Sequence, residues 1–337
     1  MSYVLITGGC GYIGIHTALK LIEENYEVIL FDNFSNSSKN ILQSINSITK
    51  KNILIIEGDI RNKHDLQNVF LNYDIGSIIH FAACKSVDES IINPKKYYDN
   101  NVLGTINLIN EMDKYNVRKI VFSSSATVYG DKNIPPLNEK ITDLNPINPY
   151  GKSKLIIENY LQDLCDSDPR WSALSLRYFN PVGAHKSGLV GEDLDQNPSN
   201  LMPNILNKIA MQKTLTVYGG DYDTKDGSCI RDYIHIDDLA EGHILALKKC
   251  QEESYSGVIN LGTGKGYTVI DVLTTFMKVN EVNINFKIGK RRRGDVVSSY
   301  ADVSKAKKDL GWQAKYGLEE MCEDSWMWYQ NYKKLSK

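Results

Sequence analysis

The sequence of 337 residues lacks any apolar run close to the roughly 20 residues that a membrane-spanning helix needs. Its first residues enter an apolar segment directly, without the basic region and long apolar core of a secretory signal. The six cysteines are scattered and form no Cys-x-x-Cys pair, which argues against a disulfide framework. We therefore expect a soluble, cytoplasmic protein that does not engage a membrane.

A dominant charge of one sign is also missing. The chain has 39 Lys and Arg against 41 Asp and Glu, a net charge of −2, which argues against a nucleic-acid partner held by phosphate electrostatics. The six histidines show no metal-ligand spacing, since even His235 and His243 are eight residues apart. We predict no metal site. With 42% hydrophobic and 24% charged residues, the composition is that of a globular protein.

Short apolar runs alternate with longer amphipathic stretches in the first half of the chain. The apolar runs are rich in β-branched and aromatic residues, as in strands buried on both faces, and predict strands at residues 3–7, 27–31, 53–57, 77–81, 119–123 and 172–178. Helices are expected at residues 12–24, 38–48, 63–72, 95–115 and 149–166. This alternation predicts an α/β fold, a Rossmann-type doubly wound parallel sheet.

The alternation breaks down after about Tyr178. Further helices are expected at residues 201–212, 237–250, 269–279, 303–310 and 317–332, separated by short strands and turns. We predict a second, smaller α/β substrate-binding domain. The approximate division is residues 1–180 for the first domain and 181–337 for the second, although later segments could return to the first.

A glycine pattern follows the first predicted strand. Gly8, Gly11 and Gly14 precede a helix, where glycine permits a tight turn and a close approach of a pyrophosphate. Asp32 ends the next strand and can accept hydrogen bonds from an adenosine ribose, which favours NAD over NADP. Asp59, after the third strand, could similarly contact the adenine, and a turn or cap is the alternative for both aspartates.

Tyr150 and Lys154 lie four residues apart, at the start of a predicted helix with Asn148 as cap and Pro149 in the first position. A free phenol has a pKa of about 10. A nearby ammonium, together with a nicotinamide ring, is expected to lower that pKa and make the phenol a base. By itself this pair is common on solvated helices, which is the alternative interpretation.

Three consecutive serines, Ser123–Ser125, end the fifth predicted strand. Ligands of open parallel sheets bind beyond the carboxyl ends of the strands. Hydroxyl groups there can contact a substrate oxygen beside the cofactor, so this segment strengthens the case for an active site formed with Tyr150 and Lys154.

These elements occur in the order and spacing of the extended short-chain dehydrogenase/reductase family, and in combination they resemble the UDP-glucose 4-epimerases. The resemblance runs from about residue 3 to about residue 329. It is carried by Thr7–Gly14, Glu57–Arg61, His80–Ala83, Tyr97–Val102, Phe122–Gly130, Tyr150–Lys154, Arg177–Ala184 and Arg231–His235.

The resemblance implies an isomerase that interconverts UDP-glucose and UDP-galactose with bound NAD. Tyr150 would take the proton of the sugar 4-hydroxyl while C4 gives its hydride to NAD, and Ser125 would hydrogen-bond O4. Lys154 would hold the nicotinamide ribose and support the Tyr150 phenolate. The 4-keto sugar would then present its other face, and the returning hydride would invert the stereocentre.

The resemblance also implies two sets of binding residues. The cofactor set is Gly8, Gly11, Tyr12, Ile13, Gly14, Asp32, Asn33, Asn36, Asp59, Ile60, Phe81, Lys85, Asn100, Tyr178 and Phe179. The substrate set is Ser125, Thr127, Tyr150, Asn180, Asn200, Leu201, Tyr218, Arg231, Arg292, Asp295 and Ser299.

Ser299 occupies a position where bacterial members of the family often carry tyrosine, at the wall of the sugar pocket near C2. A small side chain there predicts additional activity on UDP-GlcNAc and UDP-GalNAc. The resemblance further implies a homodimer, with the helices near residues 95–115 and 149–166 of each subunit forming a four-helix bundle.

Three other functions share parts of this pattern. An epimerase of UDP-glucuronate or a UDP-pentose would keep the same catalytic residues. A nucleotide-sugar 4,6-dehydratase would need acidic residues where this chain has Ala126 and Thr127. A non-catalytic NAD-binding protein would not need both Tyr150 and Lys154.

Overall fold

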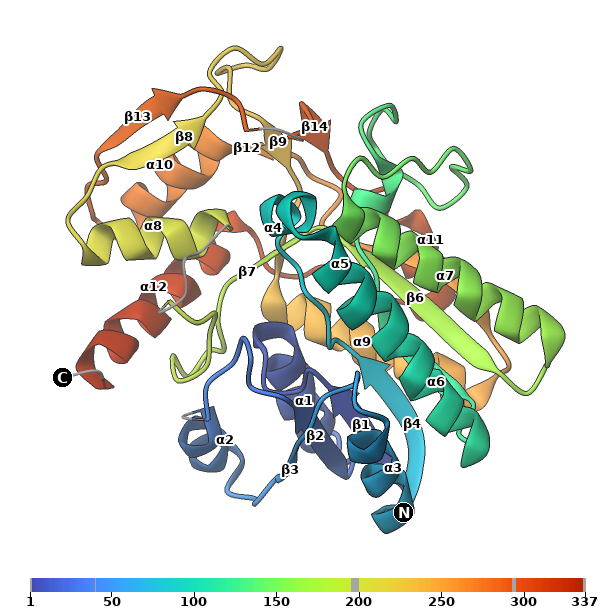
Figure 1. Cartoon of the computed structure of the whole chain (residues 1–337). Coiled ribbons are helices and arrows are strands. Elements are labelled where there is room, and N and C mark those ends of the chain that lie inside the picture. Colours follow the sequence, from blue (N-terminus) through green and yellow to red (C-terminus); the bar gives the residue numbers. More distant parts are fainter. Residues whose placement is uncertain (1, 40, 195–199, 293–294, 336–337) are drawn as a thin grey trace.

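A computed structural model describes residues 2–39, 41–194, 200–292 and 295–335 (Figure 1). Seven parallel strands form its main sheet, in the order β11-β6-β5-β4-β1-β2-β3. They are β1 (Tyr3–Thr7), β2 (Val28–Asp32), β3 (Leu54–Glu57), β4 (Ile75–His80), β5 (Lys119–Ser123), β6 (Ser172–Tyr178) and β11 (Ser256–Leu261). The strand order reverses between β1 and β4, which confirms the predicted doubly wound sheet.

Helices cover both faces of this sheet, because alternate residues of each strand point to opposite sides. On β1, Val4 and Ile6 belong to one buried cluster and Leu5 to the other. The first face carries α1 (Tyr12–Glu23), α2 (Ile41–Thr49), α9 (Ile236–Glu252) and α11 (Ser304–Leu310). The second face carries α3 (Lys63–Asn72), α6 (Gly104–Lys114) and α7 (Pro149–Ser167).

The helix predicted at residues 95–115 is divided into three parts. It begins as α5 (Pro94–Tyr97), continues as the wider π-helix η1 (Tyr98–Leu103) and ends as α6. The short helix α4 (Val87–Ile92) precedes it, and the 3-10 helix η2 (Ala126–Tyr129) follows β5. π-helical turns are rare and concentrate at functional sites, which makes η1 a candidate for a functional segment.

The second, smaller region occupies the upper and left parts of Figure 1. Its helices are α8 (Leu201–Ala210), α10 (Val269–Val279) and α12 (Leu318–Leu335). Its short strands are β7 (Asn180–Val182), β8 (Leu215–Tyr218), β9 (Ile230–Arg231), β10 (Tyr233–His235), β12 (Tyr267–Thr268), β13 (Phe286–Gly289) and β14 (Ser298–Ser299). They form three small sheets, and a separate apolar cluster fills this region.

The chain returns to the first region before it ends. Strand β11 pairs with β6 at one edge of the main sheet, and α9 and α11 pack against the same sheet. The division at residue 180 therefore remains an approximate prediction. Within the described parts of the chain, no helix is long and apolar enough to cross a bilayer.

Candidate active site

The glycine loop connects β1 to α1 at the carboxyl edge of the sheet. Gly8 has a φ of +67°, and a Cβ built on it would lie 2.6 Å from the backbone nitrogen of Ala82. A Cβ on Gly14 would lie 2.4 Å from the carbonyl oxygen of Gly8. Gly11 caps α1 without a side-chain hydrogen bond, which leaves the helix N-terminus open to an anion. The loop therefore fits a dinucleotide pyrophosphate.

Asp32 and Asp59 lie beside this loop, at the ends of β2 and β3. Asp32 is buried and accepts hydrogen bonds from the backbone amides of Cys10 and Phe34, at 3.0 and 2.9 Å. The Asp59 carboxylate binds Arg61 and accepts a hydrogen bond from Asn33 at 2.9 Å. Hydrogen bonds from Arg61 lower the pKa of Asp59 to about 2. Both carboxylates are thus held in place at the expected sheet edge.

Tyr150 sits in the first turn of α7. The Asn148 side chain accepts a hydrogen bond from the Gly151 amide at 2.9 Å, and Pro149 occupies the first helical position, as predicted from the sequence. Tyr150 is half-buried, and the Ser125 hydroxyl lies near enough to its phenol to favour the phenolate. The phenol and the strand-end hydroxyl are therefore close together.

Burial raises the pKa of Tyr150, and this effect outweighs the Ser125 hydrogen bond and the Lys85 charge, which lower it. The expected lowering of this pKa by Lys154 and a bound nicotinamide ring concerns the protein with its cofactor and stays a prediction. The Lys154 ammonium lies 5.8 Å from the centre of the Tyr150 ring and donates instead to the Ser123 carbonyl, at 2.7 Å. Because Lys154 is fully buried, its own pKa is lowered to about 7.

The π-helix η1 brings Asn101, a residue outside the predicted set, under the site. The Asn101 amide oxygen accepts from the Cys84 backbone nitrogen at 2.8 Å, and its nitrogen donates to the Ser153 hydroxyl at 3.0 Å. Asn100 donates to the same oxygen at 3.0 Å. Asn101 thus ties the segment after β4 to helix α7. Two adjacent amides in an otherwise amphipathic helix were the sequence signal for it.

The other predicted cofactor residues surround this edge in different ways. The Tyr12 hydroxyl donates to the Gly183 carbonyl at 2.8 Å, and Ile13 packs against the buried core. Phe81 and Tyr178 both lie next to His243, with ring centres at 4.8 and 5.7 Å from the centre of its ring. Three further positions complete the set: Ile60 and Phe179 are buried, and Asn36 is exposed on the loop after β2.

A second cluster, in the smaller region, contains two arginines and one aspartate. The Asp295 carboxylate lies 3.0 Å from Nε of Arg292 and 3.5 Å from Nη2 of Arg231. The Arg292 guanidinium lies 5.3 Å from the centre of the Tyr218 ring. Ser299 of β14 pairs directly with Arg231 of β9. Five predicted substrate residues therefore share one place.

The remaining predicted substrate residues come from three separate segments. The Asn180 side chain donates to the Asp232 carbonyl at 2.9 Å, and the Thr127 hydroxyl donates to Ser125 at 2.9 Å. Asn200 and Leu201 begin α8. Thr127 therefore belongs to the Ser125 side of the site, whereas Asn200 and Leu201 belong to the smaller region.

Glu192 joins the cofactor side to the substrate side, and sequence reasoning missed it. One carboxylate oxygen of Glu192 accepts from the Lys85 ammonium at 2.9 Å and from the Asn200 amide at 3.1 Å. Its backbone carbonyl accepts from the Trp328 indole at 3.0 Å. These contacts depend on distant segments, so no local pattern could have found them.

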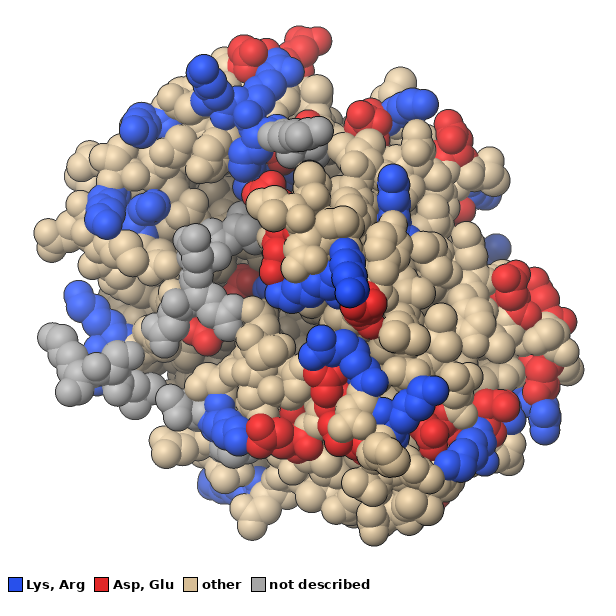
Figure 2. Space-filling view, viewed as in Figure 1, with Lys and Arg blue, Asp and Glu red and all other residues tan. Residues whose placement is uncertain are grey.

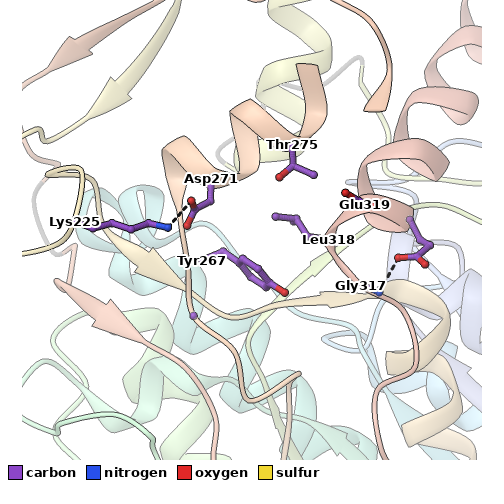
Figure 3. Close-up of a pocket in the computed structure, with 9 residues that line it drawn as sticks. Lys225, Tyr267, Asp271, Thr275, Gly317, Leu318 and Glu319 are labelled. Atoms are coloured by element: carbon purple, nitrogen blue, oxygen red, sulfur yellow. Dashed lines mark hydrogen bonds and ion pairs between the residues drawn. The ribbon is translucent and has the colours of Figure 1, made fainter. Parts of the chain in front are cut away.

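A surface pocket of about 530 Å³ lies elsewhere, between α10 and the start of α12 (Figure 3). The Lys225–Asp271 ion pair crosses one end of it at 2.6 Å, and Tyr267 and Leu318 line it. None of the predicted site residues lines this pocket. Figure 2 shows acidic and basic side chains interspersed over one face of the molecule, without a single-sign patch across its described part.

Comparison with known proteins assigns the family. A family model described as GDP-mannose 4,6 dehydratase matches residues 5–325. The UDP-glucose 4-epimerase of Dictyostelium discoideum is 48% identical over 327 residues, which cover 96% of this chain and 95% of that protein. The chain belongs to the UDP-glucose 4-epimerase family. The resemblance stated from the sequence motifs is thus confirmed.

Solved structures agree with this assignment. The UDP-glucose 4-epimerase of Stenotrophomonas maltophila, with bound NAD and formylated UDP-arabinopyranose, matches with a TM-score of 0.96 and 39% identity, covering 99% of this chain and 100% of that one. The Bifidobacterium longum enzyme, in complex with NAD+ and UDP, matches with a TM-score of 0.93 and 44% identity, covering 98% and 99%. The 4-epimerase family thus shares the whole fold of this chain, including the smaller region.

Proposed function

We propose that the protein is an NAD-dependent UDP-glucose 4-epimerase that interconverts UDP-glucose and UDP-galactose. One observation carries this proposal: Tyr150 lies beside Ser125 and Lys154 at the carboxyl edge of a Rossmann-type sheet, in a chain of the 4-epimerase family. An edge of this kind is where such sheets bind their ligands.

The glycine loop and the strand ends would hold NAD. The open N-terminus of α1 would receive the pyrophosphate, and Asp32 the adenosine ribose, with Asp59 near the adenine. Lys85 would add a charge-assisted hydrogen bond to the pyrophosphate. The other predicted cofactor residues would line the same edge.

Bound NAD would supply the exchange of hydride with C4 of the sugar. The residues of the chain would manage the proton: Tyr150 would accept it from the 4-hydroxyl and return it to the same oxygen. Ser125 would hydrogen-bond that oxygen, because its hydroxyl lies beside Tyr150. Lys154 would orient the nicotinamide ribose and, when protonated, favour the phenolate.

The arginine–aspartate cluster would hold UDP. Arg231 and Arg292 carry the positive charge that a pyrophosphate needs, and Asp295 can accept from a ribose hydroxyl. Tyr218, beside Arg292, offers an aromatic face to the base. With Asn180, Asn200 and Leu201, these residues would fix the nucleotide while the sugar turns over at Tyr150.

The sugar pocket would accept more than one UDP-sugar. Ser299 leaves room beside Arg231, so UDP-GlcNAc and UDP-GalNAc are further substrates in this proposal. The Ser299→Tyr variant should lose turnover of the acetylated pair while keeping that of UDP-galactose. Equal turnover of acetylated sugars by parent and variant would remove this part of the proposal.

A UDP-pentose is a second substrate candidate. The related Stenotrophomonas maltophila enzyme was solved with a formylated UDP-arabinopyranose. A pentose lacks C6 but keeps the 4-hydroxyl at which Tyr150 would act. Rates with UDP-xylose and UDP-galactose, measured on one preparation, would rank the two substrates.

We also propose a cytoplasmic homodimer that uses the helices near residues 95–115 and 149–166. Leu103 of η1 and Ile156 of α7 expose 49% and 42% of their surface, more than apolar side chains on packed helices usually do. Pairing of these helices with a second copy would cover both. Sedimentation of the parent and a Leu103→Glu/Ile156→Glu variant would test this, and a monomeric parent would contradict it.

The central experiment is incubation of the purified protein with UDP-galactose, without added NAD, followed by measurement of UDP-glucose. Formation of UDP-glucose is expected, because the cofactor returns to its starting state in each cycle and can stay bound. Absence of product, even after NAD is added, would overturn the proposal. Tyr150→Phe protein from a parallel preparation is the control for contaminating activity.

A further inference from the structure

Three consecutive serines at the end of β5 meet three residues on one face of α7. Tyr150, Lys154 and Glu158 are spaced by four residues and therefore share that face. The Ser125 hydroxyl lies beside the Tyr150 phenol, and the Ser123 carbonyl accepts from Lys154 at 2.7 Å. The third contact runs from the Ser124 hydroxyl to the Glu158 carboxylate. Strand and helix are thus joined at three successive positions.

Glu158 is itself held by a buried arginine from the neighbouring strand β6. Nε and Nη2 of Arg177 donate to the Glu158 carboxylate at 2.9 and 2.6 Å. Both side chains are only 4% exposed, so water does not compete for this pair. The Ser124 backbone nitrogen also donates to the Leu176 carbonyl at 2.9 Å, which ties the end of β5 to β6.

The same arginine reaches the turn that follows the serines. The Arg177 guanidinium lies 4.9 Å from the centre of the Tyr129 ring, at the end of η2. The Tyr129 hydroxyl donates to Asn260 of β11 at 2.8 Å. Ser125 is therefore enclosed by groups fixed on both sides, Ser124 before it and η2 after it.

A buried ion pair is a weak source of stability, because the loss of water around both charges offsets their attraction. This pair nevertheless contacts Ser124, the residue directly before Ser125 of the candidate active site. We propose that Glu158, held by Arg177, is a positioning residue: through Ser124 it fixes the end of β5 so that Ser125 faces Tyr150 and the Ser123 carbonyl faces Lys154. This inference rests on the proposed epimerase function.

The proposal predicts an effect on turnover rather than on substrate affinity. Glu158 lies far along the chain from the arginine–aspartate cluster, and the nucleotide contacts there do not use it. A displacement of about 1 Å at reacting groups can lower a rate on the order of a hundredfold. Loss of one of the two supports of Ser124 should cost less, since the Leu176 contact remains.

The first test is the Ser124→Ala variant, which removes the hydroxyl and leaves the ion pair intact. We expect kcat to fall about tenfold, in line with a partial displacement, while KM for UDP-galactose and bound NAD stay unchanged. Ser175→Ala is the matched control, since it removes an equally buried hydroxyl from β6. A Ser124→Ala kcat within twofold of the parent, or an equal fall in Ser175→Ala, would overturn the proposal.

The second test replaces the pair by apolar side chains in a Glu158→Leu/Arg177→Met variant. Such exchanges often preserve stability, so the variant should keep its Tm and still lose kcat. An unchanged kcat per folded molecule would contradict the positioning role. An inactive parent protein would instead overturn the proposed function. If the parent inverts UDP-galactose and the Tyr150→Phe variant does not, the proposed function stands and these variants test the positioning role alone.

Discussion

The two regions of the chain build their binding residues in different ways. In the first region, candidate residues end or follow the strands of one parallel sheet, and buried hydrogen bonds fix them, as for Lys154 on the Ser123 carbonyl. In the smaller region, they come from separate short strands, and opposite charges hold one another, as for Arg292 and Asp295. Arg292 is 39% exposed and Lys154 only 1%.

This difference indicates a division of labour. Buried groups on a continuous sheet keep a fixed geometry, which proton and hydride transfer require. In partly exposed charge pairs, each charged group can release its partner and bind a ligand instead, which suits the reversible capture of a nucleotide. We expect changes in the first region to affect turnover and cofactor retention, and changes in the second to affect substrate affinity.

The largest effect should come from Tyr150→Phe, in the first region. Loss of the base should lower kcat by about a thousandfold, within the usual range for acid–base groups. UDP lacks the sugar, so its affinity, measured by calorimetry, should stay within about twofold. Turnover within tenfold of the parent would break the proposed division, because it would place the chemistry elsewhere.

The next effect is expected from Gly8→Ala, in the glycine loop. The new methyl group would meet the Ala82 nitrogen at 2.6 Å while φ stays at +67°. The variant should lose bound NAD, measured by absorbance after acid release, as well as thermal stability. Gly311→Ala is the matched control, because its φ is +64° and nothing lies within 4 Å of a Cβ there. The control should lose only about 1–2 kcal/mol, the cost of the backbone conformation alone.

A third effect is expected from Arg292→Ala, in the smaller region. Loss of a charged hydrogen bond to the nucleotide should raise KM for UDP-galactose about tenfold, with kcat close to that of the parent. Lys290→Ala removes the same charge from an exposed position two residues away and should leave both constants unchanged. A fall in kcat without a change in KM would contradict a pure binding role for the smaller region.

The smallest effect concerns acid stability of the first region. Burial lowers the pKa of His243 to about 4 from an ordinary value of 6.5. The unfolded chain therefore takes up a proton between these values that the folded protein refuses, and stability falls as the pH drops below 6.5. Between pH 7 and pH 5.5, the unfolding free energy of the His243→Gln variant should therefore fall by about 1 kcal/mol less than that of the parent. Urea unfolding at both pH values would measure it. His64→Gln, at an exposed position, should leave the loss unchanged.

Much of the first region could be predicted because its signals are local. A strand, a glycine turn and a helix follow one another within residues 3–23, and Asn148 with Pro149 marks the start of α7. The glycine loop, the strand-end serines and the Tyr150–Lys154 pair then indicated the family and with it the fold. What the local signals could not contain was burial, which raises the pKa of Tyr150 in the protein without cofactor.

Longer-range contacts explain the other gaps. The π-helix η1 interrupts a regular helical pattern where Asn101 bonds to Cys84 and to Ser153 of helix α7. Glu192 meets Lys85 across more than a hundred residues. Glu158 follows Tyr150 and Lys154 at the same four-residue spacing on α7, which does not by itself indicate a role. Its partner Arg177 comes from strand β6. The roles of individual site residues stay predictions until variants are measured.

The return of β11 to the edge of the main sheet has a consequence for engineering and for evolution. Neither region is a contiguous piece of chain, so a cut near residue 180 would strip β11 from β6 and expose a buried strand edge. Specificity cannot be altered by exchanging a C-terminal module as a block. New substrates must instead be reached through point changes or short loop replacements within the smaller region.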